Sequence, residues 1–189
     1  IQSTPAIDSL VRADMVNGLA VEMDRAALNG GVNANEPNGL LQTTGVGSVA
    51  YDATSGLTER ASLIALSTAV AAQDADNDSQ GFIATPEMRG RLKSTLTDPN
   101  GGGIPIWSSE REKDGVGGLL GWPAAVTNNL PKNLGAGTDE HGAIFGSWNE
   151  LLIGSWGTVS VQVDPYSAGS KGATILRIFH DMDVALRHP

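Results

Sequence analysis

The stretch 158–163 reads Thr-Val-Ser-Val-Gln-Val and alternates polar with apolar residues at every position. A period of two places successive side chains on opposite faces, so the stretch predicts a β-strand. After a loop at residues 164–172, residues 173–188 return, and at about 3.3 Å per residue they would extend on the order of 50 Å. The sequence therefore predicts a hairpin with unusually long strands. In the return strand one face should carry Leu176, Ile178, Met182, Val184 and Leu186, and the other Arg177, Asp181, Asp183 and Arg187.

A second long element is predicted near the start of the sequence. Ser3 or Thr4 can cap a helix there, and Pro5 fits its first turn because that position needs no N–H partner. The run 29–31, Asn-Gly-Gly, then offers the left-handed backbone conformations that end helices. At about 1.5 Å per residue, the helix would be on the order of 36 Å long. Spacings of three and four predict one apolar stripe, formed by Ile7, Leu10, Val11, Met15, Leu19 and Met23.

Shorter elements are predicted between these two. Thr85 can cap a helix that has Pro86 at its first turn. The glycine clusters 101–103 and 115–118 are expected to be flexible loops. Helices are expected at 58–73 and 86–94, and strands at 81–84, 122–126 and 143–146. In the first of these helices, the residues expected to point inward are Leu63, Ile64, Leu66 and Val70. The chain as a whole predicts an α+β fold.

Composition excludes several classes of function. The chain has 189 residues, with 12 Lys and Arg against 21 Asp and Glu, a net charge of −9. Such an acidic balance argues against binding nucleic acid through its phosphates and against docking on an anionic membrane. Cysteine is absent, so disulfides, thiolate catalysis, Cys-ligated zinc and iron–sulfur clusters are excluded. The sequence opens on Ile1 without a signal-like start, so we expect a segment of a longer polypeptide.

Two motifs invite a ligand-binding interpretation and fail its requirements. The run 74–79, Asp-Ala-Asp-Asn-Asp-Ser, begins with the spacing of a calcium-binding EF-hand loop. Its sixth position is Ser79 where glycine is needed, and its twelfth is Thr85 where a glutamate is needed. A solvated helix end is the favoured interpretation. The glycine clusters lack the following Lys-Ser or Lys-Thr of a phosphate-binding loop, so a loop remains the favoured interpretation there too.

Histidines and tryptophans do not form a recognisable catalytic pattern either. His180 and His188 are expected on the apolar face of the return strand, and His141 adjoins Asp139 and Glu140 in a polar loop. The metal-binding spacing His-Glu-x-x-His does not occur, so structural roles are favoured over metal ligation. The hydrolase motif Gly-x-Ser-x-Gly is also absent. The sequence therefore predicts no catalytic, cofactor-binding or metal-binding residue. Core or interface packing is the expected role of Trp107, Trp122, Trp148 and Trp156.

One segment is more distinctive than the rest. Residues 119–131 read Leu-Leu-Gly-Trp-Pro-Ala-Ala-Val-Thr-Asn-Asn-Leu-Pro. Other motifs surround it in order: Ala-Ala-Leu-Asn-Gly-Gly at 26–31, Asn-Glu-Pro-Asn-Gly-Leu-Leu at 35–41, Phe-Ile-Ala-Thr-Pro-Glu-Met-Arg at 82–89 and Ile-Phe-Gly-Ser-Trp at 144–148. With the closing hairpin, this series resembles the major capsid protein family of tailed bacteriophages, whose fold is named after phage Hong Kong 97. The resemblance covers nearly the whole chain.

The resemblance implies a capsid-type α+β fold with two domains. Residues 1–44 and 156–189 would form a peripheral domain of spine helix and long hairpin, and residues 45–155 a mixed α/β axial domain. The implied function is a structural subunit of an icosahedral phage or prophage capsid. Such subunits assemble into pentamers and hexamers that enclose the genome. No enzymatic activity, cofactor or metal is implied.

The implied partners are other copies of the chain, with scaffold, portal and maturation protease as further candidates. Neither tight nucleic-acid binding nor membrane binding is implied. The protein would be located in the virion, after assembly in the cytoplasm of a bacterial host. By position, the loop 164–172 would lie where three capsomers meet. The loop from 128 to about 142 would point toward a five-fold or six-fold centre.

The resemblance also implies parts that this sequence does not contain. These are an N-terminal arm, an extended loop before the spine helix and a last short strand. Some family members form a Lys–Asn isopeptide bond between subunits, with the lysine on that extended loop. Here the matching acceptor region is Ser170-Lys171-Gly172, without asparagine. We therefore expect no self-crosslinking.

Three alternatives remain beside the capsid interpretation. An encapsulin-like nanocompartment shell protein would share the fold and differ in its cargo. A carbohydrate-binding module would use the tryptophans as a ligand platform. A hydrolase is the least favoured, because no nucleophile–base pair is visible in the sequence.

Overall fold

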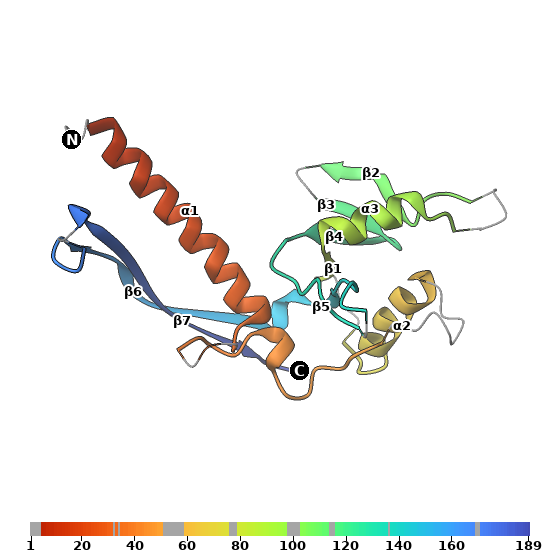
Figure 1. Ribbon diagram of the computed structural model, residues 1–189. Coiled ribbons are helices and arrows are strands. Elements are labelled where there is room, and N and C mark those ends of the chain that lie inside the picture. The colour runs from red at the N-terminus through yellow and green to blue at the C-terminus, as the bar shows by residue number, and fades with distance from the viewer. Residues whose placement is uncertain are drawn as a thin grey trace. The chain divides into compact units, whose positions relative to one another are not determined.

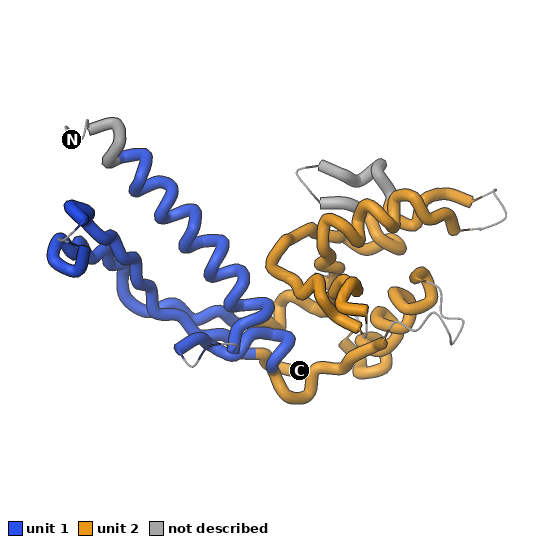
Figure 2. Tube along the Cα trace, viewed as in Figure 1, with its two compact units in different colours: residues 1–42, 152–185 blue, residues 43–151, 186–189 orange. Residues whose placement is uncertain are grey.

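The computed structural model describes residues 5–31, 33, 35–50, 59–75, 79–97, 103–113, 116–135, 137–168 and 171–189. They form two compact units, each built from stretches that are distant in sequence. The first unit comprises residues 1–42 and 152–185, and the second comprises residues 43–151 and 186–189 (Figure 2). No helix among the described residues is long and apolar enough to cross a lipid bilayer.

The first unit opens with α1, Pro5–Asn29, the long helix of Figure 1. The predicted helix and its proline start are confirmed, whereas the caps Ser3 and Thr4 lie outside the described residues. The prediction of Leu10 as part of the inward stripe is wrong, because its side chain is exposed. The half-buried stripe of α1 is therefore narrower than the sequence suggests, and its residues recur at every fourth position. The half-buried positions are Val11, Met15, Leu19 and Met23.

After α1 the chain reverses and packs against the end of the helix, and this contact requires glycine at positions 30 and 39. A Cβ atom on Gly30 would lie 2.3 Å from the carbonyl oxygen of Pro37, and one on Gly39 would lie 2.4 Å from the Gly30 nitrogen. Both distances are far below contact, so only glycine allows the turn to approach the helix this closely. Arg25 at 2.7 Å from Glu36 Oε1 joins the same two segments. Hydrogen bonds from Asn33 and then from Arg25 lower the pKa of Glu36.

The hairpin of the first unit consists of β6, Leu151–Asp164, and β7, Ile175–Leu186, which form a two-stranded sheet. The predicted hairpin is confirmed, and β6 begins seven residues earlier than Thr158. Burial along β7 alternates as predicted, with Ile178, Met182 and Val184 half-buried. Leu176 departs from the prediction and is exposed. His188 was expected on this strand but lies beyond its last residue.

The second unit is built on a five-stranded sheet with the order β2-β3-β4-β1-β5. The strands β1, Gln80–Ala84, and β4, Trp122–Val126, are parallel neighbours. The other neighbours are antiparallel, including β5, Ala143–Ser147, which pairs with β1. These three strands lie where the sequence predicts strands.

Two further strands were not predicted. Residues of β2, Trp107–Lys113, and β3, Val116–Leu119, extend the sheet beyond β4. The expectation of a flexible loop at 115–118 is therefore wrong for residues 116–118. Glycines in β3 carry no alternating side chains, so the strand is defined by its pairing on both sides rather than by its own composition. Gly101 and Gly102 of the other cluster lie outside the described residues.

Two helices belong to the second unit. The helix α2, Glu59–Ala71, contributes the fully buried Leu63, with Leu66 and Val70 packed against the core, whereas Ile64 is exposed, contrary to prediction. The helix α3, Pro86–Ser94, matches the predicted bounds. Its cap is confirmed, because the Met88 N–H donates to the Thr85 hydroxyl at 3.2 Å.

The core of the second unit lies where these helices meet one face of the sheet. The rings of Phe82 in β1 and Phe145 in β5 are in contact, with centroids 4.4 Å apart and planes tilted by 46°, and Trp122 meets Phe145 edge-on at 5.7 Å. Trp107 is also fully buried there. The other buried members of this core are Leu63, Ala84, Leu92, Ile106, Leu119 and Ala124. The second unit thus buries the apolar side chains of this core within its own chain.

Candidate functional site

Exposed apolar side chains are concentrated in the first unit. Trp156 is 57% exposed, Val163 58% and Tyr166 90%. Large exposed apolar surfaces on soluble proteins mark sites where another molecule binds. The hairpin and α1 therefore have the character of an interface. Further exposed apolar residues are Leu152, Ile153, Val159, Val161 and Phe179 on the hairpin and Leu10, Val16 and Val21 on α1.

A hydrogen-bonded turn shapes the tip of the hairpin. The Asp164 carboxylate accepts from the N–H groups of Tyr166 and Ser167 at 3.0 Å each, and also from the Ser167 hydroxyl. Arg177 reaches back from β7 to the same carboxylate at 3.0 Å. These donors, with that hydroxyl first, hold the pKa of Asp164 far below its usual range. The turn therefore fixes the backbone at Tyr166, whose side chain is 90% exposed, a feature that the sequence alone did not indicate.

The three histidines occupy three separate places. His180 Nε2 lies 2.8 Å from the Ser155 hydroxyl, across the hairpin. His188 Nδ1 lies 2.8 Å from Glu150 Oε2, where Arg187 N also donates to the Glu150 carbonyl at 3.0 Å. His141 Nδ1 lies 3.9 Å from Glu87 Oε2. The histidines therefore do not converge on one another.

His180 and Ser155 form the one serine–histidine contact found among the described residues. A hydrolytic triad requires a third group that orients the histidine through its other nitrogen. In the described structure, His180 Nδ1 is buried and has no hydrogen-bond partner. The contact is therefore a cross-strand pair that stabilises the hairpin, and the arrangement lacks the orienting group of a hydrolase.

The loop after β4 is tethered to the start of α3. Lys132 lies 2.9 Å from Glu87 Oε1 and 2.8 Å from Asn128 Oδ1, which fastens the loop to the start of α3. The hydrogen bond from Lys132 is the largest cause that lowers the pKa of Glu87. Gly142 N donates to the Pro131 carbonyl at 2.9 Å and closes the loop at its base.

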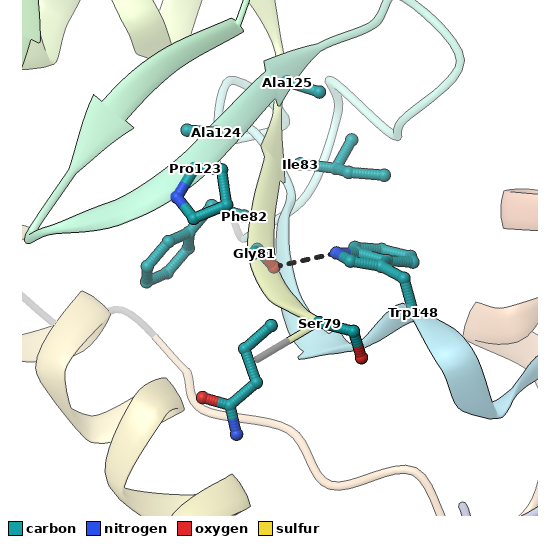
Figure 3. Close-up of a pocket in the computed structure, with 9 residues that line it drawn as sticks. Ser79, Gly81, Phe82, Ile83, Pro123, Ala124, Ala125 and Trp148 are labelled. Carbon is teal, nitrogen blue, oxygen red and sulfur yellow. Dashed lines mark hydrogen bonds between the residues drawn. The ribbon is translucent and has the colours of Figure 1, made fainter. Parts of the chain in front are cut away.

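The tryptophans do not form one ligand platform. Trp107 and Trp122 belong to the core of the second unit, whereas Trp156 belongs to the first unit. Trp148 stands beside a shallow cavity of about 340 Å³ and donates its indole N–H to the Gly81 carbonyl at 3.2 Å (Figure 3). The cavity is lined by Ser79, Gln80, Gly81, Phe82, Ile83, Pro123, Ala124, Ala125 and Trp148, none of which is ionisable. A platform of stacked tryptophans is therefore not supported.

Residues 76–78 of the acidic run 74–79 lie outside the described residues. Elsewhere in the described part of the chain, no group of three or more His, Asp or Glu side chains is placed to hold a metal ion.

Comparison with protein families identifies the family of this chain. The model of the phage capsid family matches residues 1–189. The chain belongs to the phage capsid family. That membership agrees with the resemblance inferred from the sequence motifs.

Individual proteins of known name agree with the family. The chain is 27% identical over 186 residues to the major capsid protein of Halomonas phage phiHAP-1, which covers 98% of the chain and 28% of that protein. It is 30% identical over 84 residues to the major capsid protein of Klebsiella oxytoca phage phiKO2, which covers 39% of the chain and 20% of that protein. The chain thus spans less than a third of the length of these relatives.

Solved capsid structures share the fold. The capsid of an empty GTA particle aligns with 99% of the chain and 65% of its own chain, at 17% identity and a TM-score of 0.66. The capsid of a native GTA particle aligns with 96% of the chain and 69% of its own, at 16% identity and a TM-score of 0.62. The predicted capsid-type α+β fold is confirmed.

Proposed function

We propose that this protein is a structural subunit of a phage or prophage capsid and acts by binding copies of itself. One observation carries the proposal: a chain of the phage capsid family leaves the apolar side chains of its helix α1 and its hairpin exposed. Exposed residues such as Val161 and Trp156 lose their contact with water when a second copy covers them. Burial of apolar area is the main favourable term in such association.

We propose that the chain has two domains, a peripheral one of residues 1–44 and 156–189 and an axial one of residues 45–155. The division of the chain into compact units supports this proposal at residues 42 and 152, which lie near the proposed bounds. Residues 186–189 differ, because they belong to the second unit. In this assignment the exposed surface belongs to the peripheral domain, and the covered core to the axial domain.

Closed symmetry multiplies modest contacts into a stable shell. Each copy would use the same patches on every neighbour, so pentamers and hexamers would follow from one set of interfaces. Other copies are the main proposed partners, with scaffold, portal and maturation protease as further ones. We place the protein in the virion, after assembly in the host cytoplasm, and we assign it no enzymatic activity.

The acidic surface fits this proposal. With a net charge of −9, a shell wall would not bind packaged DNA tightly through its phosphates.

Assembly of the protein, observed by negative-stain electron microscopy and size-exclusion chromatography, tests the proposal. We expect shells or capsomer rings. Val161→Asp should abolish them, because it places a charge on an apolar patch that must be buried. Gln162→Asp is the matched control, since it adds the same charge next to that position at a residue already polar and exposed. A strictly monomeric protein at all concentrations would refute the proposal.

A further inference from the structure

A small groove lies on the hairpin of the first unit, toward the start of β6 and the end of β7. Its volume is about 190 Å³, room for one aromatic side chain. Leu152, Trp156 and Ala185 are apolar residues of its lining, and Asp183 is the acidic one. The remaining lining residues are Gly154 and Val184.

The indole of Trp156 lies close to the backbone of Gly154, which also lines this groove. A Cβ atom on Gly154 would lie 2.9 Å from Cη2 of the Trp156 indole. Any larger residue at position 154 would therefore push the indole away from the strand. The indole face is left partly open, since Trp156 is 57% exposed.

The carboxylate of Asp183 can accept a further hydrogen bond. Its Oδ1 atom accepts from the Val184 N–H at 2.8 Å. A carboxylate offers two oxygens and about four acceptor positions. A ligand suited to this groove therefore has a flat apolar body and a hydroxyl or N–H donor at its end.

Tyr166 has both properties of such a ligand. Its ring is apolar and flat, its hydroxyl is a donor, and its side chain is 90% exposed in the Asp164 turn at the other end of the same hairpin. Leu152 and Asp164 are twelve positions apart along the strand, a separation on the order of 40 Å in extended form. Tyr166 therefore cannot reach the groove of its own chain.

We propose that Tyr166 of one copy inserts into the groove of Leu152, Trp156 and Asp183 on a second copy. The phenol ring stacks against the Trp156 indole, and its hydroxyl donates to the Asp183 carboxylate. The contact is head-to-tail, because the tip of one hairpin meets the base of the next. Head-to-tail contacts close into rings or extend without limit, depending on the rotation between copies. The inference rests on the proposed function and names the residues through which copies bind.

Photo-crosslinking tests the proposal without removing the aromatic anchor. Benzoylphenylalanine replaces Tyr166, the assembled protein is irradiated, and mass spectrometry maps the crosslink. We expect a covalent dimer joined to residues 152–156 or 183–185. The probe at Val16, an exposed residue of α1, is the control and should not label that groove.

The outcomes separate this inference from the proposed function. Shells or rings whose crosslinks from position 166 map elsewhere would overturn the inference and leave the proposed function standing. Absence of both assemblies and crosslinks would overturn both. Dimers crosslinked at the groove without shells or rings would support the inference and contradict the function.

Substitutions in the groove give a second measurement. Ala185→Leu fills the groove and should raise the concentration needed for assembly, whereas Ala185→Ser keeps its size and should not. Tyr166→Ala should raise that concentration on the order of thirtyfold, the effect of a hot-spot residue. Tyr166→Phe keeps the ring and should cost about fivefold for the lost hydrogen bond. Equal assembly by Ala185→Leu and Ala185→Ser would contradict the proposal.

Discussion

The two units of this chain treat their apolar residues in opposite ways. In the second unit, Phe82, Leu63 and Trp107 are almost fully buried by the chain itself. In the first unit, Val161 and Trp156 of the hairpin remain about half exposed. One unit thus buries an apolar core within its own described residues, whereas the other leaves large apolar side chains exposed. The stability of the second unit should be an internal property, and that of the first should depend on assembly.

Removing a core ring of the second unit should have the largest effect. Phe82→Ala deletes the partner of Phe145 and leaves a cavity beneath the sheet, so it should lower the free energy of unfolding by about 3–5 kcal/mol. Denaturant unfolding followed by circular dichroism measures this loss. Val161→Ala in the hairpin is the comparison and should change the unfolding of the unassembled chain by less than about 0.5 kcal/mol. Equal losses for both variants would erase the contrast between the units.

The glycine contact at the end of α1 should give the next largest effect. Gly39→Ala places a methyl group 2.4 Å from the Gly30 nitrogen and 2.7 Å from the Ala26 carbonyl oxygen. The turn must move away from the helix, which should cost about 1–3 kcal/mol, as overpacking does. Gly18→Ala, at a helical position with no atom within 4 Å, is the control and should be neutral or slightly stabilising. Thermal unfolding of the two variants distinguishes them.

The cap of α3 should contribute less. Thr85→Ala removes the hydroxyl that accepts from the Met88 N–H, and it should destabilise the second unit by about 1 kcal/mol. Thr85→Ser keeps the acceptor and should restore most of the loss. Denaturant midpoints of the three proteins measure this difference, and a Ser variant as weak as Ala would show that the buried methyl group matters instead.

The smallest effect concerns pH at the hairpin tip. The pKa of Asp164 is lowered in the folded chain, so its contribution is present above the ordinary pKa of about 4 and is lost only as pH falls through the folded value. The tip turn should therefore persist unchanged from neutral pH to below pH 4. An NMR titration of the Asp164 carboxyl carbon measures this directly. A midpoint near 4 would show that the turn does not hold the carboxylate.

The contrast between the units also explains what the sequence could and could not predict. The start of α3 follows from Thr85 and Pro86, because both signals are local. The hairpin follows from the period of two in residues 158–163. Polar β2 and glycine-rich β3 escaped prediction because their strand state comes from pairing within the sheet. Local pattern therefore predicts an element when the element's own residues determine it.

The interface could be predicted only in part. Alternation shows that a strand has an apolar face, but it does not show whether the same chain covers that face. Exposure of Leu10 and Ile64, both expected to be inward, illustrates this limit. The contact of Ser155 with His180 depends on the register of the hairpin, and the position of Tyr166 depends on four hydrogen-bond donors to one carboxylate. Such features appear only once the backbone is placed in space.

Hydroxyl-radical footprinting of the unassembled and the assembled protein tests the central claim most directly. The account predicts that Trp156 and Tyr166 are oxidised readily in the unassembled chain and become protected on assembly. Trp107, buried in the second unit, should be protected in both states and serves as the internal standard. Equal oxidation of Trp156 and Tyr166 in both states would contradict the claim that copies of the chain cover this surface.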